Sequence, residues 1–294
     1  MIDTQILSGR VTDKIKESVS CEHSYSCNCI RTCNGKSCST HCSTCYEHSN
    51  DYDYNIHSTI GTFTINRIDR QGNHEPPRFT LVKKEDAVAK TDTYINYIKG
   101  AKNSLFNMKD YSDSSLVRLP EYPLEIYDYY KINRTIVDGV TIPDKSSYDD
   151  MLSELLKKLG ETKQVNVVLV FTNQDRLFAE KLKTKWLNGK KNDTVIVIGT
   201  KDYPNIEWVH VFGWSNNQML NIALRDDLIE HKVITVTGMR DSLTKNLNMY
   251  YSRKPMSDFE YLKNNSEPSM VVLITAFILT MIFSIGFSYI AIKD

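Results

Sequence analysis

The chain has 294 residues, enough for two modest domains, and its 36 basic residues balance its 36 acidic ones. This balance excludes the global basic footprint of a nucleic-acid-binding protein, so we expect no nucleic-acid partner. The first residues, MIDTQILSGRVTDKIKE, hold no apolar run of the signal-peptide kind, which predicts synthesis in the cytoplasm.

The cysteines are confined to a short block near the N-terminus. All 7 cysteines lie between Cys21 and Cys45, and His23, His41 and His48 are interleaved with or follow them. The other residues of the block are mainly Ser, Thr, Asn and Gly, which cannot order a segment by hydrophobic burial. Metal ions or disulfides must therefore hold it.

Two chemistries compete for this block, and free thiols are a third alternative. In a reducing cytoplasm, thiolates and imidazoles at these spacings suit tetrahedral zinc, and Cys42-x-x-Cys45 has the spacing of a zinc knuckle. In an exported chain the same cysteines would form disulfides and leave one thiol over. We favour zinc, with His23 as an alternative histidine to His48. The predicted ligands, enough for two sites, are Cys21, Cys27, Cys29, Cys33, Cys38, Cys42, Cys45 and His48.

The segment after the cysteines has the pattern of β-structure. Residues 61–68 alternate polar and apolar side chains, which predicts a half-buried strand, and residues 79–82 predict another. We therefore expect a Cys-rich β module over residues 1–90. The strings CYEH at 45–48, RIDRQG at 67–72 and EPPR at 75–78 resemble uncharacterised membrane proteins of bacteriophages and bacteria.

Residues 91–145 form a tyrosine-rich connecting region without a catalytic motif. A tyrosine cluster can be a binding surface, but the wet edge of a core is the favoured interpretation. The tyrosines are Tyr94, Tyr97, Tyr111, Tyr122, Tyr127, Tyr129 and Tyr130.

The stretch 146–237 has the order of an α/β domain. Apolar residues at helical spacing over 148–159 predict an amphipathic helix, and the apolar runs 165–171 and 194–199 predict strands buried on both faces. Further helices are expected at 177–186 and 217–228, with an edge strand at 206–213 between them. This order predicts a three-layer α/β sandwich.

The same stretch resembles the TPM domain family. The likeness lies in the strand 167–170, Trp186, the run GKKNDTVIV at 189–197, and the strand ending FGW at 212–214. Asp193 stands where the family has the glycine of an Asn-Gly pair. The resemblance implies phosphatase activity, divalent-ion binding or an accessory role at a membrane.

Three aspartates flank the two buried strands and form a weaker candidate site for Ca²⁺ or Mg²⁺. Asp175 follows the first strand, and Asp193 and Asp202 bracket the second. Oxygen-rich loops suit these hard cations. No catalytic residue can be assigned, because the sequence has no G-x-S-x-G elbow, Walker loop or H-E-x-x-H motif.

The C-terminal stretch from Met270 to Ile292 carries no charged residue. About 20 apolar helical residues suffice to cross a bilayer, so the stretch predicts a transmembrane helix with the lipid bilayer as its partner. Residues 238–268 would be a polar tether. Basic residues before the span predict a single-pass protein with its head in the cytoplasm.

These patterns together predict a mixed α+β and α/β fold. It would comprise an N-terminal Cys-rich β module, a three-layer TPM-like α/β domain and one C-terminal transmembrane helix. The predicted function is a membrane-anchored adaptor that binds a protein partner. The alternative is a membrane-tethered, metal-dependent phosphatase.

Overall fold

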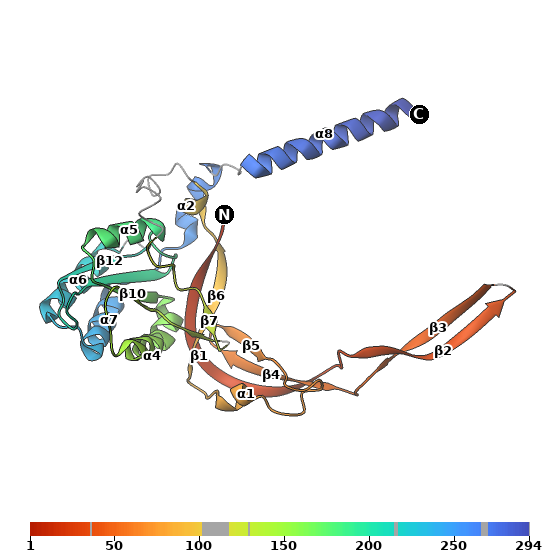
Figure 1. Cartoon of the computed structure of the whole chain (residues 1–294), viewed down its shortest axis with the longest axis horizontal. Coiled ribbons are helices and arrows are strands. Elements are labelled where there is room, and N and C mark those ends of the chain that lie inside the picture. Colours follow the sequence, from red (N-terminus) through yellow and green to blue (C-terminus); the bar gives the residue numbers. More distant parts are fainter. Residues whose placement is uncertain (36, 102–117, 129, 215–216, 266–269, 294) are drawn as a thin grey trace.

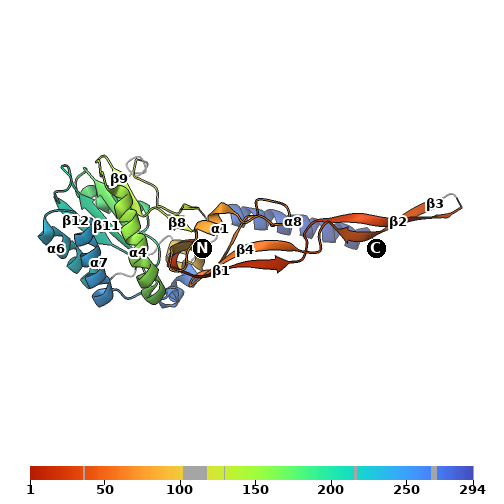
Figure 2. The same cartoon turned by 90° about the horizontal axis from the view of Figure 1, so that it is seen from below.

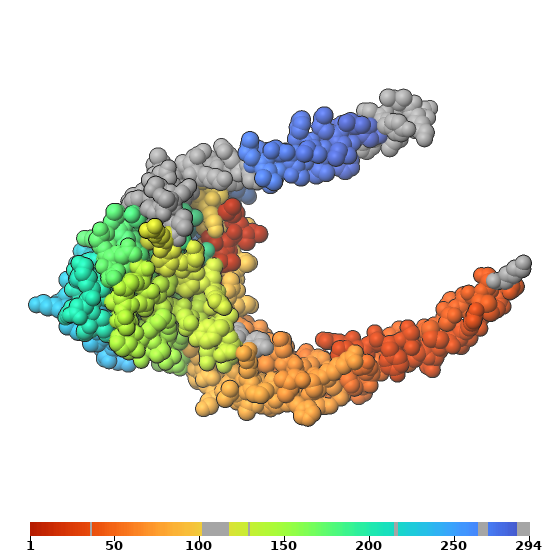
Figure 3. Space-filling view, viewed as in Figure 1, coloured from red at the N-terminus to blue at the C-terminus, as the bar shows by residue number. Residues whose placement is uncertain are grey.

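A computed structural model describes residues 1–35, 37–101, 118–128, 130–214, 217–265 and 270–293. The predicted tyrosine-rich region therefore falls partly outside the described residues, with Tyr111 and Tyr129 among those not covered. A body contains the two larger sheets, and a long hairpin and helix α8 extend away from it (Figures 1 and 3).

An antiparallel sheet of four strands, in the order β5-β4-β1-β6, is built around one long strand. The strands are β1 (Ile2–Val19), β4 (Asp51–Ser58), β5 (Gly61–Ile65) and β6 (Ala87–Ile95). The first half of β1 pairs with β6 and its second half with β4. Residues 79–82 were predicted to form a strand, but residues 79–81 belong to helix α1 (Pro77–Leu81). Pro77 opens this helix, because a proline ring fixes a φ angle suited to the first helical position.

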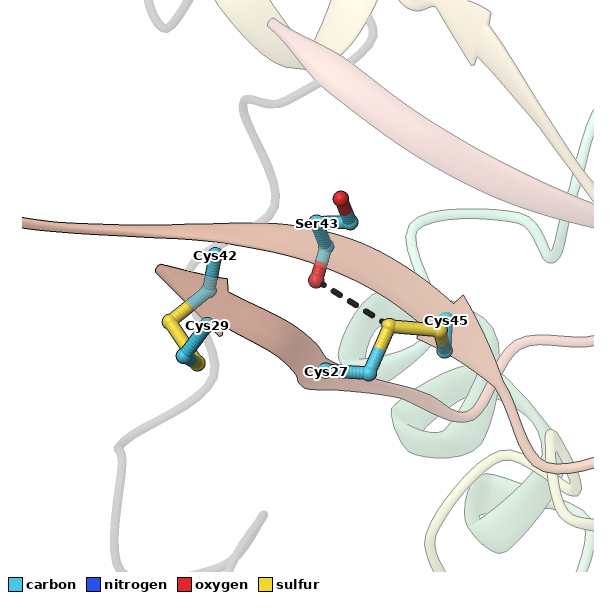
Figure 4. Close-up of a disulfide and its surroundings, with 5 residues drawn as sticks. All are labelled: Cys27, Cys29, Cys42, Ser43 and Cys45. Atoms are coloured by element: carbon cyan, nitrogen blue, oxygen red, sulfur yellow. Dashed lines mark hydrogen bonds between the residues drawn. A yellow bond between two sulfur atoms is a disulfide. The ribbon is translucent and has the colours of Figure 1, made fainter. Parts of the chain in front are cut away.

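A two-stranded hairpin, here called the arm, projects from the end of this sheet (Figures 1 and 2). It consists of β2 (Ser24–Asn34) and β3 (Ser37–Tyr46), which form a sheet of their own. Almost all of their residues are exposed. The arm is crosslinked by three disulfides: Cys27–Cys45, Cys29–Cys42 and Cys33–Cys38. Figure 4 shows the first two.

A second sheet, in the order β12-β11-β10-β9, carries the largest core. Its strands are β9 (Thr135–Asp138), β10 (Asn166–Thr172), β11 (Asp193–Gly199) and β12 (Trp208–Phe212). The first three run parallel and β12 is antiparallel. One face is covered by α4 (Lys145–Lys163), α6 (Gln218–His231) and α7 (Val236–Tyr250), and the other by α5 (Leu177–Lys185). Both faces of β10 and β11 are thus buried, which explains their apolar runs.

Several short elements lie outside the two larger sheets. They are α2 (Tyr97–Gly100), β7 (Ile126–Tyr127), β8 (Lys131–Ile132) and the 3₁₀ helix η2 (Met256–Asn265). Helix α7 occupies much of the region expected to be a polar tether. It buries Met239, Leu243 and Leu247, whose spacing of four residues places them on one helical face.

The transmembrane helix predicted from Met270 to Ile292 is wrong. The stretch folds as α8 (Met270–Lys293), whose side chains are described from 270 to 286. Crossing a bilayer core takes about 20 apolar residues, and no helix within the described part of the chain is long and apolar enough to do so. The predicted fold class, bilayer partner and single-pass localisation depended on this span. The fold is corrected to a mixed α/β chain with several sheets and a disulfide-linked arm.

Candidate functional site

Three potential metal ligands meet where the chain enters and leaves the arm. Cys21 follows β1, His48 follows β3, and Asp51 is the first residue of β4. The side chains of Cys21 and Asp51 are buried, and that of His48 is partly exposed. The folding of the arm back on itself therefore brings residues up to thirty positions apart to one point.

The three ligand atoms converge on that point. The Sγ of Cys21 lies 3.8 Å from Nδ1 of His48, and the same nitrogen lies 3.2 Å from Oδ1 of Asp51. All three atoms lie within 4.8 Å of one another. A tetrahedral zinc ion with bonds of about 2.0–2.3 Å separates its nitrogen, oxygen and sulfur ligands by about 3.4–3.6 Å. The cluster is therefore close enough to hold a metal ion.

The geometry differs from that of a catalytic Cys-His-Asp triad. In such a triad the histidine uses one ring nitrogen for the nucleophile and the other for the carboxylate. Here Nδ1 of His48 faces both Cys21 and Asp51. The arrangement suits three ligands around a common centre better than a proton relay.

The second oxygen of Asp51 is held by groups outside the cluster. Oδ2 accepts hydrogen bonds from the backbone N–H of Glu22 at 3.0 Å and from Nη1 of Arg67 at 3.0 Å. Arg67 is held in turn by Asp53, at 2.6 Å from its Nη2. The Glu22 N–H, with smaller contributions from His48, Cys21 and Arg67, keeps the pKa of Asp51 below its usual range despite burial. Such outer contacts orient a ligating carboxylate and keep it ionised.

The structure brings together only part of the predicted zinc-ligand set. Cys21 and His48 lie in the cluster, whereas the remaining six cysteines are paired in disulfides, which leaves them no thiolate for a metal. The alternative histidine, His23, contributes its backbone oxygen, 3.6 Å from the Sγ of Cys21. Asp51 was not among the predicted ligands. Its spacing of three residues from His48 is a signal that could have identified it.

The three aspartates proposed for Ca²⁺ or Mg²⁺ are not gathered at one place. Because β10 and β11 are parallel, Asp175 and Asp202 follow the carboxyl ends of strands whereas Asp193 begins β11 at the opposite edge. The length of the strand separates the two edges by about 20 Å. Asp175 and Asp202 accept local hydrogen bonds, from Leu177 N and from the side chain of Asn205.

Asp193 belongs instead to a buried polar network. Its carboxylate accepts hydrogen bonds from the Tyr122 hydroxyl at 2.9 Å, from Nδ2 of Asn166 at 2.9 Å, and from the backbone N–H of Lys190. Burial raises the pKa of Asp193 to about 6 although these donors oppose the shift. This carboxyl group connects the start of the strand to the tyrosine-rich region.

No protein-family model, curated protein or solved structure matches the chain. The resemblances to the TPM domain family and to phage and bacterial membrane proteins stay predictions.

Proposed function

We propose that this chain is a binding protein, an adaptor, that contacts a protein partner through its arm. The observation that carries the proposal is the arm itself, residues 24–46, which stands away from the body with almost every side chain exposed (Figure 3). A lone two-stranded hairpin is at best marginally stable in water. Three disulfides stabilise the arm in place of a hydrophobic core. Its shape is therefore maintained although the arm does not contribute to the packing of the body.

The exposed side chains of the arm suit a protein surface. Tyr25, Ile30 and Tyr46 are large apolar residues on it, and Ile30 is 70% exposed. Tyrosines and buried apolar anchors contribute disproportionately to protein interfaces. The described strands of the arm contain Arg31 but no Asp, Glu or Lys. This charge favours a partner with an acidic surface.

We further infer that the metal ion suited to the cluster at the base of the arm is zinc. One thiolate, one imidazole and one carboxylate are ligand types that zinc accepts, and calcium and magnesium prefer oxygen alone. Cys21, His48 and Asp51 would each supply one bond, and a fourth position would stay open. An ion there would tie the two ends of the arm together and fix its direction.

The phosphatase alternative gains no support from the geometry. A hydrolytic site needs its metal ligands and cationic groups around one reacting centre. Asp175, Asp193 and Asp202 lie at opposite edges of the sheet, so no specific observation favours that chemistry.

The arm proposal can be tested by site-specific photocrosslinking in cells that produce the full chain. A benzophenone amino acid replaces Ile30 on the arm or, as the matched control, Met219 on helix α6, which is also an exposed apolar residue. We expect a discrete adduct with another protein from position 30 only. Equal adducts from both positions, or none from position 30, would show that the arm is not a selective contact surface.

A further inference from the structure

A cavity of about 630 Å³ lies between α4 and the long strand β1. Figure 1 shows where these two elements meet. Its walls come from β1, β6, the β7–β8 hairpin and the first half of α4. This volume is within the range of small-molecule sites, about 300–1,000 Å³. The cavity is separate from both the arm and the metal cluster.

A buried cation lines this cavity. Arg134 is only 2% exposed, and its guanidinium has two partners, both neutral: Nε donates to Asn166 at 2.9 Å and Nη2 to Ser8 at 2.8 Å. Among the described residues, Nη1 has no hydrogen-bond partner and no carboxylate lies within ion-pair distance of the guanidinium. The carboxylates of Asp149 and Asp193 favour the charged guanidinium only from a distance, and neither pairs with it directly. A buried charge without a direct ion pair is costly, so an anion bound at Nη1 would stabilise it.

The nearby carboxylate of Asp149 does not fill that role. Its Oδ1 accepts the backbone N–H groups of Arg134 and Thr135 at 2.7 and 2.8 Å, and its Oδ2 accepts Nζ of Lys145 at 2.8 Å. Burial lowers the pKa of Arg134 to about 10, so the guanidinium stays charged at neutral pH. A carboxylate from outside the protein could bind at Nη1 and supply the direct ion pair that the guanidinium does not have among the described residues.

The rim of the cavity is richer in acidic than in basic groups. Its carboxylates are those of Asp86, Asp128, Asp150 and Glu154, and its cations are those of Arg78 and Lys131. Arg78 pairs with Asp128 at 2.8 Å, and Glu154 pairs with Lys157. Asp150 is exposed and has no ion-pair partner among the described residues. A doubly charged phosphate would be repelled by this rim, whereas a cationic group would be attracted.

We propose that this cavity binds a small zwitterion of the amino-acid class. The ligand's carboxylate pairs with Nη1 of Arg134 at the cavity wall, and its ammonium group faces Asp150 at the rim. The two charges of the ligand thus match a buried cation and an exposed anion. This site is independent of the proposed arm contact.

Isothermal titration calorimetry on the full chain tests the proposal. Glycine and L-lysine are the zwitterionic probes, and acetate and inorganic phosphate are the anion probes. We expect saturable binding of at least one zwitterion, tighter than that of acetate or phosphate. Replacing Arg134 with Met, which is similar in length and uncharged, should weaken it by at least tenfold.

A surface variant keeps the test decisive if Arg134→Met fails to fold. Asp150→Asn should weaken zwitterion binding several-fold and leave acetate binding unchanged. The matched control is Asp226→Asn, an exposed aspartate on α6 outside the cavity, which should bind like the parent chain. The proposal is overturned if no zwitterion binds, if acetate or phosphate binds as tightly, or if Asp150→Asn has no effect.

Discussion

Replacing the six paired cysteines with serine should unfold the arm while leaving the body folded. The strands of the arm pair with each other in a separate sheet, and their side chains take no part in the hydrophobic clusters of the body. The arm therefore depends on its crosslinks, and the body does not depend on the arm.

The size of the effect follows from the loops that the crosslinks close. Cys27–Cys45 spans 18 residues and Cys29–Cys42 spans 13, and a loop of that length restricts the unfolded chain by about 3 kcal/mol. The loops are nested, so their contributions do not add. Loss of about 3 kcal/mol corresponds to a fall of about a hundredfold in the protection of arm amides from hydrogen exchange.

Hydrogen exchange followed by mass spectrometry measures both parts of the chain in one experiment. We expect peptides from residues 24–46 to lose their protection, while peptides from β10 and β11 keep theirs and the thermal midpoint of the body is unchanged. Ser26→Ala is the control, because Ser26 is an exposed residue of β2 that takes part in neither a disulfide nor the metal cluster. The reasoning would be refuted if the arm stayed protected without its disulfides, or if the body lost stability when the arm unfolded.

Three further predictions concern the body and the metal cluster. Since burial raises the pKa of Asp193 to about 6, its contribution to stability is full below about pH 4 and is lost as the pH rises through 6, by about 3 kcal/mol. The free energy of unfolding by urea should change less between pH 4 and pH 7 in Asp193→Asn than in the parent chain. Identical changes in the two proteins would mean that the carboxyl group of Asp193 is ionised throughout. Elemental analysis should find one zinc per chain and none in Cys21→Ser, whereas equal zinc in both would exclude this ligand. Gly72→Ala should destabilise the fold by about 1–3 kcal/mol, because Gly72 has φ +79° and an added Cβ would overlap the Tyr52 carbonyl. Thermal unfolding should show a smaller cost for Gly35→Ala, about 1 kcal/mol, because φ is also positive there but the added Cβ would meet no neighbouring atom.

The elements predicted best from the sequence are those whose pattern of apolar side chains indicates which faces are buried. The run 165–171 is apolar throughout, and strand β10 is found there with both faces covered. Helix α7 was missed because its apolar residues are few and widely spaced among polar ones. The stretch from Met270 has a clear apolar pattern, yet no helix among the described residues is both long and apolar enough to cross a bilayer. Pattern alone thus describes local structure better than it describes what a segment packs against.

The candidate site was harder to predict because its ligands come from separate segments. Cysteine spacing is compatible with both zinc and disulfides, and the choice depends on strand register. In the hairpin Cys33 lies directly opposite Cys38, which brings two sulfurs together across the strands. Asp51 becomes a candidate ligand only once the arm has closed. Arg134 is likewise an ordinary loop residue in the sequence, and only the fold shows that it is buried.

The pairing of β1 has a mechanical consequence for anything attached to the arm. This single strand of 18 residues runs about 60 Å from the body to the base of the arm and changes partner along the way. Because the arm connects the end of β1 to the start of β4, a pull on the arm draws both strands in the same direction. The load falls in shear on the hydrogen bonds of β1 to β6 and of β4 to β5. Antiparallel bonds lie across the strand, so many of them must yield together rather than one after another. The molecule is therefore built to bear tension along this line.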